Sequence, residues 1–292
     1  MEDPSAVWNR HGLHPGSVWT TFRTGMGWGL PALPDLTLAE TPGKRRLRFV
    51  AISDTHNKHD DLVVPPGDVL IHAGDVTWGG TLAEVEAFNA WLGTLPHKHK
   101  IVVAGNHDFA FDPQICKDEP WKHLHKYHGD DSLPKMTGRD MAAKYLTNCT
   151  YLCEEAATID GVQIYATPHQ ETIHVIDHKM AFNLDTEEQL AEQFAKVPET
   201  ADVLLTHGPP KGVGRLDRMV AGLSVGSSAL AERIKQLDAA AGTGRLKFCV
   251  FGHVHEGYGV SALGKVACIN AASVDMRYRA AHPPIVFDVP VP

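Results

Sequence analysis

The sequence has few cysteines and no long apolar run. Its five cysteines are scattered and include no CxxC pair, so they form no evident disulfide framework. No stretch approaches the roughly 18 apolar residues that a transmembrane helix needs, and the opening MEDPSAVWNRHGLHPG is too polar for a secretory leader. We therefore expect a soluble, cytoplasmic protein in a reducing compartment.

The chain also lacks an excess of positive charge. Its formal net charge is −8 at pH 7, from 35 acidic and 27 basic residues. This balance predicts no general binding to nucleic acid and no attraction to an anionic membrane. With 43% hydrophobic and 21% charged residues, the composition is typical of a soluble globular protein. A ligand that carries phosphate would have to be held locally, by metal ions or a few cations.

Short apolar runs alternate with helical patterns along the chain. The expected strands are RFVAIS (48–53), DVLIHA (68–73), KIVVAG (100–105), DVLLTH (202–207), LKFCVFGH (246–253) and PIVFDVP (284–290). The expected helices cover 81–95, 186–197 and 227–240, and hairpins turn at Asp160-Gly161 and Gly264-Lys265. Hairpins mixed with crossovers indicate an α/β fold with a mixed sheet, or two stacked sheets, flanked by helices. We expect one domain over 47–292, preceded by an extension over 1–46.

Polar residues recur where the expected strands end. The segments are SDTH (53–56), GD (74–75), GNHD (105–108), TH (206–207) and GHVH (252–255). Strand ends of this kind line the ligand crevice of α/β folds, so we expect these segments to converge. Within GHVH, side chains of an extended segment alternate, so His253 and His255 would point the same way.

The converging side chains offer oxygen and nitrogen ligands without a thiolate. They are Asp54, His56, Asp75, Asn106, His207, His253 and His255. Such a set suits manganese, iron, zinc or nickel. Seven ligands exceed what one ion needs, and one aspartate can bridge a pair, so two divalent transition-metal ions fit better than one. A chance pair of surface histidines is the simpler alternative for His253 and His255 taken alone.

In this order, the motifs resemble the calcineurin-like metallophosphoesterase superfamily. The runs ISDTH, GDVLIHAGDVT, FNAWLGTLP, GNHDFAFD, THGPP and HEGYG resemble its metallophosphoesterase-domain-containing branch, over about residues 47–290. The resemblance implies two stacked mixed β-sheets flanked by helices, an αββα sandwich. It also implies that Asp54, His56 and His255 hold one ion and that Asn106, His207 and His253 hold the other, with Asp75 as the bridge.

The resemblance implies a binuclear phosphoesterase, with manganese among the candidate metals. A hydroxide that bridges the ions would attack phosphorus in line, and His107, outside both metal sites, would protonate the leaving oxygen. Asp108 would either orient His107 or cap its loop. The expected activity is hydrolysis of a phosphodiester or a phosphomonoester, with nucleotide-like esters among the candidates.

The run GDVTWGG (74–80) bears on the substrate. In related protein phosphatases this run is GDxVDRG, in which the arginine grips phosphate and the aspartate supports the catalytic histidine. GDVTWGG has neither residue, so a small-molecule ester is favoured over a phosphoprotein. A stacking wall could be formed by Trp78, Phe109, Phe182 and Tyr258, with burial in the core as the equal alternative. His169 stands where relatives of this branch tend to carry tryptophan, which makes it a candidate specificity residue.

Two other functions stay open. The metals could serve a non-phosphate substrate in a specialised pathway, for which His169 and the unusual segment 113–140 leave room. A non-catalytic scaffold of the same fold would be expected to lose ligands, whereas all seven positions and His107 are present. The histidines of WKHLHKYH (121–128) are expected to lie on the surface of an insertion. No protein partner is indicated.

Overall fold

The computed structural model describes residues 33–37, 45–114, 136, 138–172, 180–219, 222–240 and 245–292. Most of the predicted extension lies outside these residues, as do the histidines of WKHLHKYH and Cys116. Within the described ranges, no helix is both long enough and apolar enough to cross a membrane. The other four cysteines are free thiols.

The first of two large sheets has five strands in the order β13-β1-β2-β3-β4. They are β1 (Arg46–Ile52), β2 (Val69–His72), β3 (His99–Val102), β4 (Thr150–Tyr151) and β13 (Ile285–Pro290). Strands β1 to β4 run parallel, and β13 is antiparallel to β1. The carboxyl ends of β1, β2 and β3 therefore lie at one edge of this sheet.

The second large sheet has six strands in the order β11-β12-β10-β9-β6-β5. They are β5 (Glu155–Ile159), β6 (Val162–Thr167), β9 (Val203–Thr206), β10 (Phe248–Phe251), β11 (Gly259–Leu263) and β12 (Val266–Asn270). The four central strands are parallel, and the edge strands β5 and β11 pair antiparallel with their neighbours. A separate pair, β7 (Gln170–Glu171) and β8 (Asn183–Leu184), forms a small ribbon.

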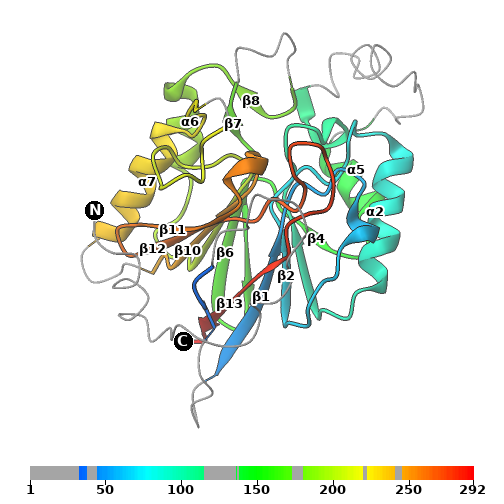
Figure 1. Ribbon diagram of the computed structural model, residues 1–292, viewed down its shortest axis with the longest axis horizontal. Coiled ribbons are helices and arrows are strands. Elements are labelled where there is room, and N and C mark those ends of the chain that lie inside the picture. Colours follow the sequence, from blue (N-terminus) through cyan, green and yellow to red (C-terminus); the bar gives the residue numbers. More distant parts are fainter. Residues whose placement is uncertain are drawn as a thin grey trace.

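The two sheets stack face to face, with helices on both outer sides (Figure 1). The first sheet carries α2 (Leu82–Thr94) and α5 (Gly138–Tyr145), and the second carries α6 (Glu187–Phe194) and α7 (Ser228–Ala239). Short 3-10 helices are η1 (His59–Asp61), η2 (Phe109–Phe111) and η3 (His255–Gly257). The predicted fold of two stacked mixed sheets flanked by helices is confirmed.

Side-chain alternation along the strands explains the three apolar layers. On β1, Phe49 faces the other sheet while Val50 faces α2, and on β10, Val250 and Phe251 divide between the two sides in the same way. Each strand buried on both faces reads as a continuous apolar run, as expected for the centre of such a sandwich. The sheets are thus fixed against each other, and their carboxyl edges are fixed with them.

Local sequence signals set the element boundaries. Thr81 and Thr186 begin α2 and α6 through capping boxes with residues three positions on, and the Ser227 hydroxyl accepts a hydrogen bond from the Leu230 amide to begin α7. The turn at Asp160-Gly161 has φ values of 49° and 86°, which suits the predicted two-residue hairpin.

One described piece of the predicted extension packs into the fold. Leu36 is 1% exposed, pairs with Phe287 of β13 and belongs to the core between the sheets. Its carbonyl accepts a hydrogen bond from the Asp288 amide at 3.1 Å. Apolar packing therefore begins before residue 47, while the division of the chain into an extension and one domain stays a prediction.

Candidate metal centre

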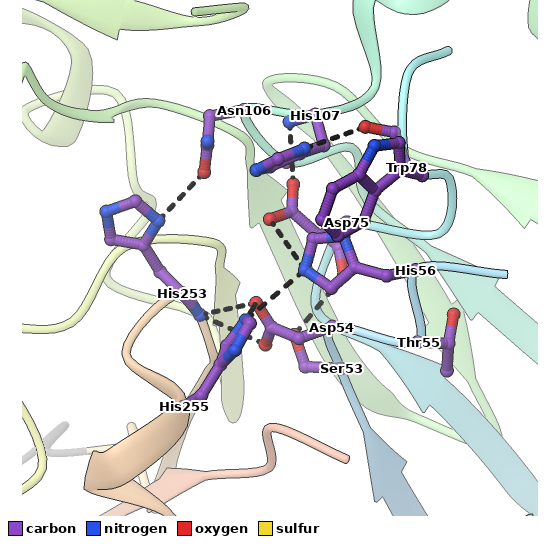
Figure 2. A network of polar contacts seen from close by, with 12 residues as sticks. Ser53, Asp54, Thr55, His56, Asp75, Trp78, Asn106, His107, His253 and His255 are labelled. Atoms are coloured by element: carbon purple, nitrogen blue, oxygen red, sulfur yellow. Dashed lines mark hydrogen bonds and ion pairs between the residues drawn. The ribbon is translucent and has the colours of Figure 1, made fainter. Parts of the chain in front are cut away.

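The predicted ligands meet where the carboxyl edges of the two sheets adjoin. We call residues 53–57, 74–78 and 105–108, which follow β1, β2 and β3, the N-terminal bank. Residues 206–208 and 252–257, which follow β9 and β10, form the C-terminal bank. The banks touch directly, because the His253 amide donates to both carboxylate oxygens of Asp54 at 2.9 and 3.0 Å. Figure 2 shows ligands of the N-terminal bank facing His253 and His255 of the C-terminal bank.

The backbone of the cluster adopts conformations that non-glycine residues rarely take. The φ values are 51° at Asp54, 40° at His56, 54° at Asp75 and 66° at His253. Left-handed backbone at such residues costs about 1 kcal/mol or more each, and it concentrates at functional sites. Hydrogen bonds between the loops hold it in place, including Asp54 N–H to the Gly74 carbonyl at 2.9 Å.

Two glycines permit the close approach of the loops. A methyl group at Gly252 would lie 1.9 Å from Asp54 Oδ2, and one at Gly105 would lie 2.3 Å from Asp75 Oδ1. Both distances are far inside van der Waals contact, so any side chain would push a ligand out of place. These glycines therefore make room for the ligands.

His207 shows why the cluster needs a cation. Its Nδ1 lies 2.8 Å from the Ala73 carbonyl, which can only accept, so Nδ1 carries the proton. In the neutral ring, Nε2 then presents a lone pair to Asn106 Oδ1 at 2.9 Å and to Asp75 Oδ2 at 3.3 Å. Three acceptors that face one another require a proton or a metal ion between them.

His56 repeats this arrangement on the other side of Asp75. Its Nδ1 lies 3.2 Å from the Thr77 carbonyl, which leaves the Nε2 lone pair 3.2 Å from His255 Nε2 and 3.5 Å from Asp75 Oδ2. His255 Nε2 in turn lies 3.5 Å from Asp54 Oδ1. The same oxygen of Asp75 thus faces a nitrogen in each half of the cluster, as a bridging ligand would.

The remaining candidate ligands complete the second half. His253 Nδ1 lies 2.8 Å from Asn106 Oδ1, and its Nε2 is buried and has no hydrogen-bond partner in the described part of the chain. Three sets of side chains offer ligand atoms within 4.8 Å of one another: Asp54-His56-His255, His56-Asp75-His107 and Asp75-His207-His253. This donor set of imidazoles and carboxylates fits divalent transition metals.

Burial is the largest influence on the pKa values in the cluster. It lowers the pKa of His56 and of His253 to about 3, which keeps both rings neutral and able to bind a metal. Burial acts against the Asp54 carboxylate, yet the hydrogen bond and charge of His255 bring its pKa down to about 2. For His207, burial is outweighed by the charge and hydrogen bond of Asp75, which raise its pKa to about 9. Positive charge is thus favoured beside Asp75.

His107 is anchored by a group that the sequence did not suggest. Its Nδ1 lies 2.8 Å from the Trp78 carbonyl, so Nδ1 carries a proton and Nε2 is left for the site. Its amide donates to Asp75 Oδ1 at 2.8 Å, and its ring centroid lies 4.6 Å from that of His56.

The Asp108 carboxylate bonds groups of the surrounding loops, and in the described part of the chain no hydrogen bond joins it to the His107 ring. The buried carboxylate accepts four hydrogen bonds, from the Val76, Thr77 and Gly105 amides and the Thr77 hydroxyl, at 2.7–3.2 Å. Of the two predicted roles, capping the loop describes its position. Burial and then the charge of Asp75 raise its pKa to about 6, against these four donors.

The predicted aromatic wall is only partly at the site. Trp78 is 39% exposed and lies beside His107, with ring centroids 5.7 Å apart. Phe109, Phe182 and Tyr258 are buried in core clusters, and the Tyr258 hydroxyl donates to the Pro283 carbonyl at 2.8 Å. His169 is half-buried against Phe182, and its Nδ1 shares a hydrogen bond of 3.1 Å with the Thr167 hydroxyl. Of the four aromatics, the structure leaves Trp78 available for stacking.

Three site residues escaped the sequence analysis. Tyr278 contacts His56, His255 and Trp78, with ring centroids 4.3–5.1 Å apart. Asn270 and His72 are fully buried residues that hold the loops of the two banks. Asn270 and His72 each end a parallel strand, the signal that marked the other candidates, whereas nothing in the motifs marked Tyr278.

The fold is an α/β sandwich of two stacked mixed sheets with helices on both sides. At the carboxyl edge of the sheets it carries a buried cluster of imidazoles and carboxylates that suits metal ions. Residues 47–257 match the model of the Calcineurin-like phosphoesterase family, and the chain belongs to this family.

Relatives cover most of the chain. Metallophosphoesterase domain-containing protein 1 of Homo sapiens is 39% identical over 246 residues, which span 84% of this chain and 72% of the human protein. A UPF0046 protein of Caenorhabditis elegans, C25E10.12, is 36% identical over 261 residues, 85% of this chain and 83% of its own. The crystal structure of TT1561 of Thermus thermophilus aligns with a TM-score of 0.49 and 12% identity, over 85% of this chain and 100% of that one.

Proposed function

We propose that this protein is a hydrolase of small-molecule phosphate esters that works with two divalent metal ions. The observation that carries the proposal is the position of Asp75 Oδ2, 3.3 Å from His207 Nε2 and 3.5 Å from His56 Nε2. Each of these nitrogens is turned inward by a carbonyl behind its ring. Membership of a phosphoesterase family supports the reaction class.

The residues divide between the two ions around Asp75. Asp54, His56 and His255 would hold one ion, and Asn106, His207 and His253 would hold the other. In support, Asp54, His56 and His255 offer ligand atoms within 4.8 Å of one another, as do Asp75, His207 and His253. Manganese, iron, zinc and nickel all suit this donor set. When bound, the two ions would supply Lewis acidity toward the phosphoryl oxygens and activate water for attack.

His107 would supply the proton that the leaving oxygen needs. Because the Trp78 carbonyl holds Nδ1–H, a protonated His107 would direct Nε2–H toward the site. The hydrogen bond from its amide to Asp75 Oδ1 fixes this position relative to the bridging carboxylate. His107 would then act as the general acid.

The surroundings of the site favour a small phosphodiester or phosphomonoester as the substrate, and the free cysteines favour the cytoplasm as the location of the protein. GDVTWGG offers no arginine to grip phosphate, and the exposed ring of Trp78 suits a flat group on the ester. The net charge of −8 disfavours nucleic acid as the partner. Four free cysteines in the described ranges suit a reducing compartment.

A panel of substrates tests this function. We expect the manganese-loaded protein to hydrolyse bis(p-nitrophenyl) phosphate or a cyclic nucleotide, and to lose this activity after treatment with a chelator until metal is restored. A phosphoserine protein should be a poor substrate. Efficient phosphoserine hydrolysis beside negligible diesterase activity would overturn the substrate class, and activity that survives metal removal would overturn the mechanism.

His107→Asn tests the general acid. A positioned acid contributes about 10²–10⁴-fold, and mainly when the leaving group is basic. The variant should therefore lose that much activity toward alkyl esters and distinctly less toward nitrophenyl esters, with unchanged metal content. A ring nitrogen of His107 also lies within 4.8 Å of possible ligand atoms of His56 and Asp75. A coincident loss of metal would assign His107 as a ligand instead.

A further inference from the structure

The loop after β12 presents one tyrosine to the metal centre. The Asp275 carboxylate closes this loop by accepting hydrogen bonds from the Arg277 amide at 2.8 Å and from the Arg279 amide at 3.1 Å. The backbone adds hydrogen bonds from Tyr278 N–H to the Asp275 carbonyl and from Asp275 N–H to the Arg279 carbonyl, at 2.8 and 2.9 Å. The loop is thus a firmly built turn, and it determines where Tyr278 lies.

Tyr278 adopts a backbone conformation that a bulky residue takes only under constraint. Its φ is 54°, in the left-handed region, as at four of the candidate ligands. In this conformation its ring meets His56 at a centroid distance of 5.0 Å, His255 at 5.1 Å and Trp78 at 4.3 Å, all near edge-on. Strain of this kind points to a role for the side chain at the site.

The hydroxyl of Tyr278 has an unused donor. It makes no hydrogen bond with any residue in the described part of the chain, whereas the Tyr258 hydroxyl donates to the Pro283 carbonyl. A tyrosine hydroxyl has an ordinary pKa of about 10, so the phenol carries a proton at neutral pH and can donate it in a hydrogen bond. A neutral phenol beside the cluster can donate to an anionic ligand there.

We propose that Tyr278 is a substrate-positioning residue whose hydroxyl donates a hydrogen bond to a non-bridging oxygen of the phosphoryl group. The inference rests on the proposed phosphoesterase function. It also accounts for the missing arginine of GDVTWGG, because Tyr278 contacts Trp78 of this run and its hydroxyl would take over part of the grip on phosphate. The adjoining ring of Trp78 would then lie against the ester group next to that phosphate.

The test compares Tyr278→Phe with the unmodified protein, using inorganic phosphate as the probe. The variant keeps the ring and loses the donor. We expect calorimetry on the manganese-loaded protein to show phosphate binding weakened by about 10- to 100-fold, the range for a hydrogen bond to a charged group, at unchanged metal content. Tyr145→Phe, on α5 at the outer face of the first sheet, is the matched control and should bind phosphate normally.

Kinetics separate this role from that of His107 and from a structural one. Tyr278→Phe should lose kcat/KM by a similar factor for nitrophenyl and alkyl esters, because the contact does not involve the leaving oxygen. If Tyr278→Phe binds phosphate and hydrolyses esters as well as the unmodified protein does, the role of Tyr278 is overturned, while the proposed phosphoesterase function is not. An unmodified, metal-loaded protein that neither binds phosphate nor cleaves esters would instead overturn the proposed function. Loss of metal from Tyr278→Phe would also contradict the proposal.

Discussion

In each bank of the candidate metal centre, a buried polar side chain bonds several backbone groups of the loops. In the N-terminal bank it acts as an acceptor, and in the C-terminal bank it acts mainly as a donor. In the N-terminal bank, the Asp108 carboxylate accepts from three amides and one hydroxyl. In the C-terminal region, the Asn270 side-chain amide donates to the carbonyls of Leu216, Gly252 and Val254, at 3.0, 3.4 and 2.8 Å. Both side chains are fully buried.

The difference follows from how the loops turn. The loops after β2 and β3 direct N–H groups inward, and only an acceptor with several lone pairs can satisfy them together. The loops around β10 direct carbonyls inward, which requires a donor. Buried backbone groups must find partners, so each bank carries the side chain that its own backbone needs. Loop geometry, and with it ligand position, thus depends on residues that bind no metal.

The largest effect is expected for Asp108→Ala. Removing the carboxylate leaves the Val76, Thr77 and Gly105 amides buried without their acceptor, which should lower the free energy of unfolding by about 3 kcal/mol or more. Asp108→Asn keeps one oxygen and the shape, so its loss should be smaller. Urea unfolding of the metal-free proteins measures both. If the urea midpoint of Asp108→Ala equals that of the unmodified protein, Asp108 does not stabilise the N-terminal bank.

For Asn270 the order of the two variants should reverse. Asn270→Asp places a carboxylate against three carbonyl oxygens and should cost about 2–3 kcal/mol. Asn270→Ala removes the donors, together with the oxygen that accepts from the Ala272 amide at 3.1 Å, but adds no repulsion and should cost about 1–2 kcal/mol. Both should also weaken metal binding by about 10–100-fold, because His253 and His255 are set by these loops. If the isosteric aspartate is tolerated better than alanine, the comparison between the banks fails.

At neutral pH the smallest effect is expected for His72, which belongs to the N-terminal side, because its contribution to stability changes only as the pH falls. Its Nδ1 accepts from the Gly74 amide at 3.2 Å and its Nε2 pairs with the Thr55 hydroxyl at 3.0 Å, so a neutral ring joins the loops that carry Asp54 and Asp75. Burial lowers the pKa of His72 to about 3.

Because the unfolded chain takes up the proton near pH 6.5 and the folded protein does not, stability due to His72 is complete above pH 6.5. It should decline by about 1 kcal/mol per pH unit as the pH falls from 6.5 toward 3. His72→Gln should flatten this part of the profile for the chelated protein. Identical slopes for both proteins would show that His72 does not need to stay neutral.

The sequence predicted the ligands because their signal is local and repeated. Each follows an apolar strand, and parallel strands bring such positions to one edge, so Asp54, Asp75 and Asn106 could be grouped without coordinates. The same rule would have marked Asn270, at the end of β12. The boundaries of α2, α6 and α7 were predictable for a similar reason, because a capping residue lies next to each helix in the chain.

What escaped prediction depends on packing between distant segments. Phe109 and Phe182 stand beside ligand motifs in sequence or in space, yet their burial against α2 and α5 depends on how the first sheet is covered. Tyr278 reaches the site only because Asp275 closes its loop and forces a left-handed φ, which no sequence pattern marked. The anchor of His107 is a backbone carbonyl, at Trp78, and a carbonyl carries no residue signature.

The central claim is that the banks enclose two ions that share Asp75. Metal stoichiometry tests this claim most directly. Elemental analysis of the metal-loaded protein should give two transition-metal ions per chain. His253→Ala should weaken the ion held with Asn106 and His207 more than the ion held with Asp54 and His56, whereas Asp75→Ala should weaken both. A single tightly bound ion in the unmodified protein, or an Asp75→Ala variant that retains one ion at full affinity, would contradict the account.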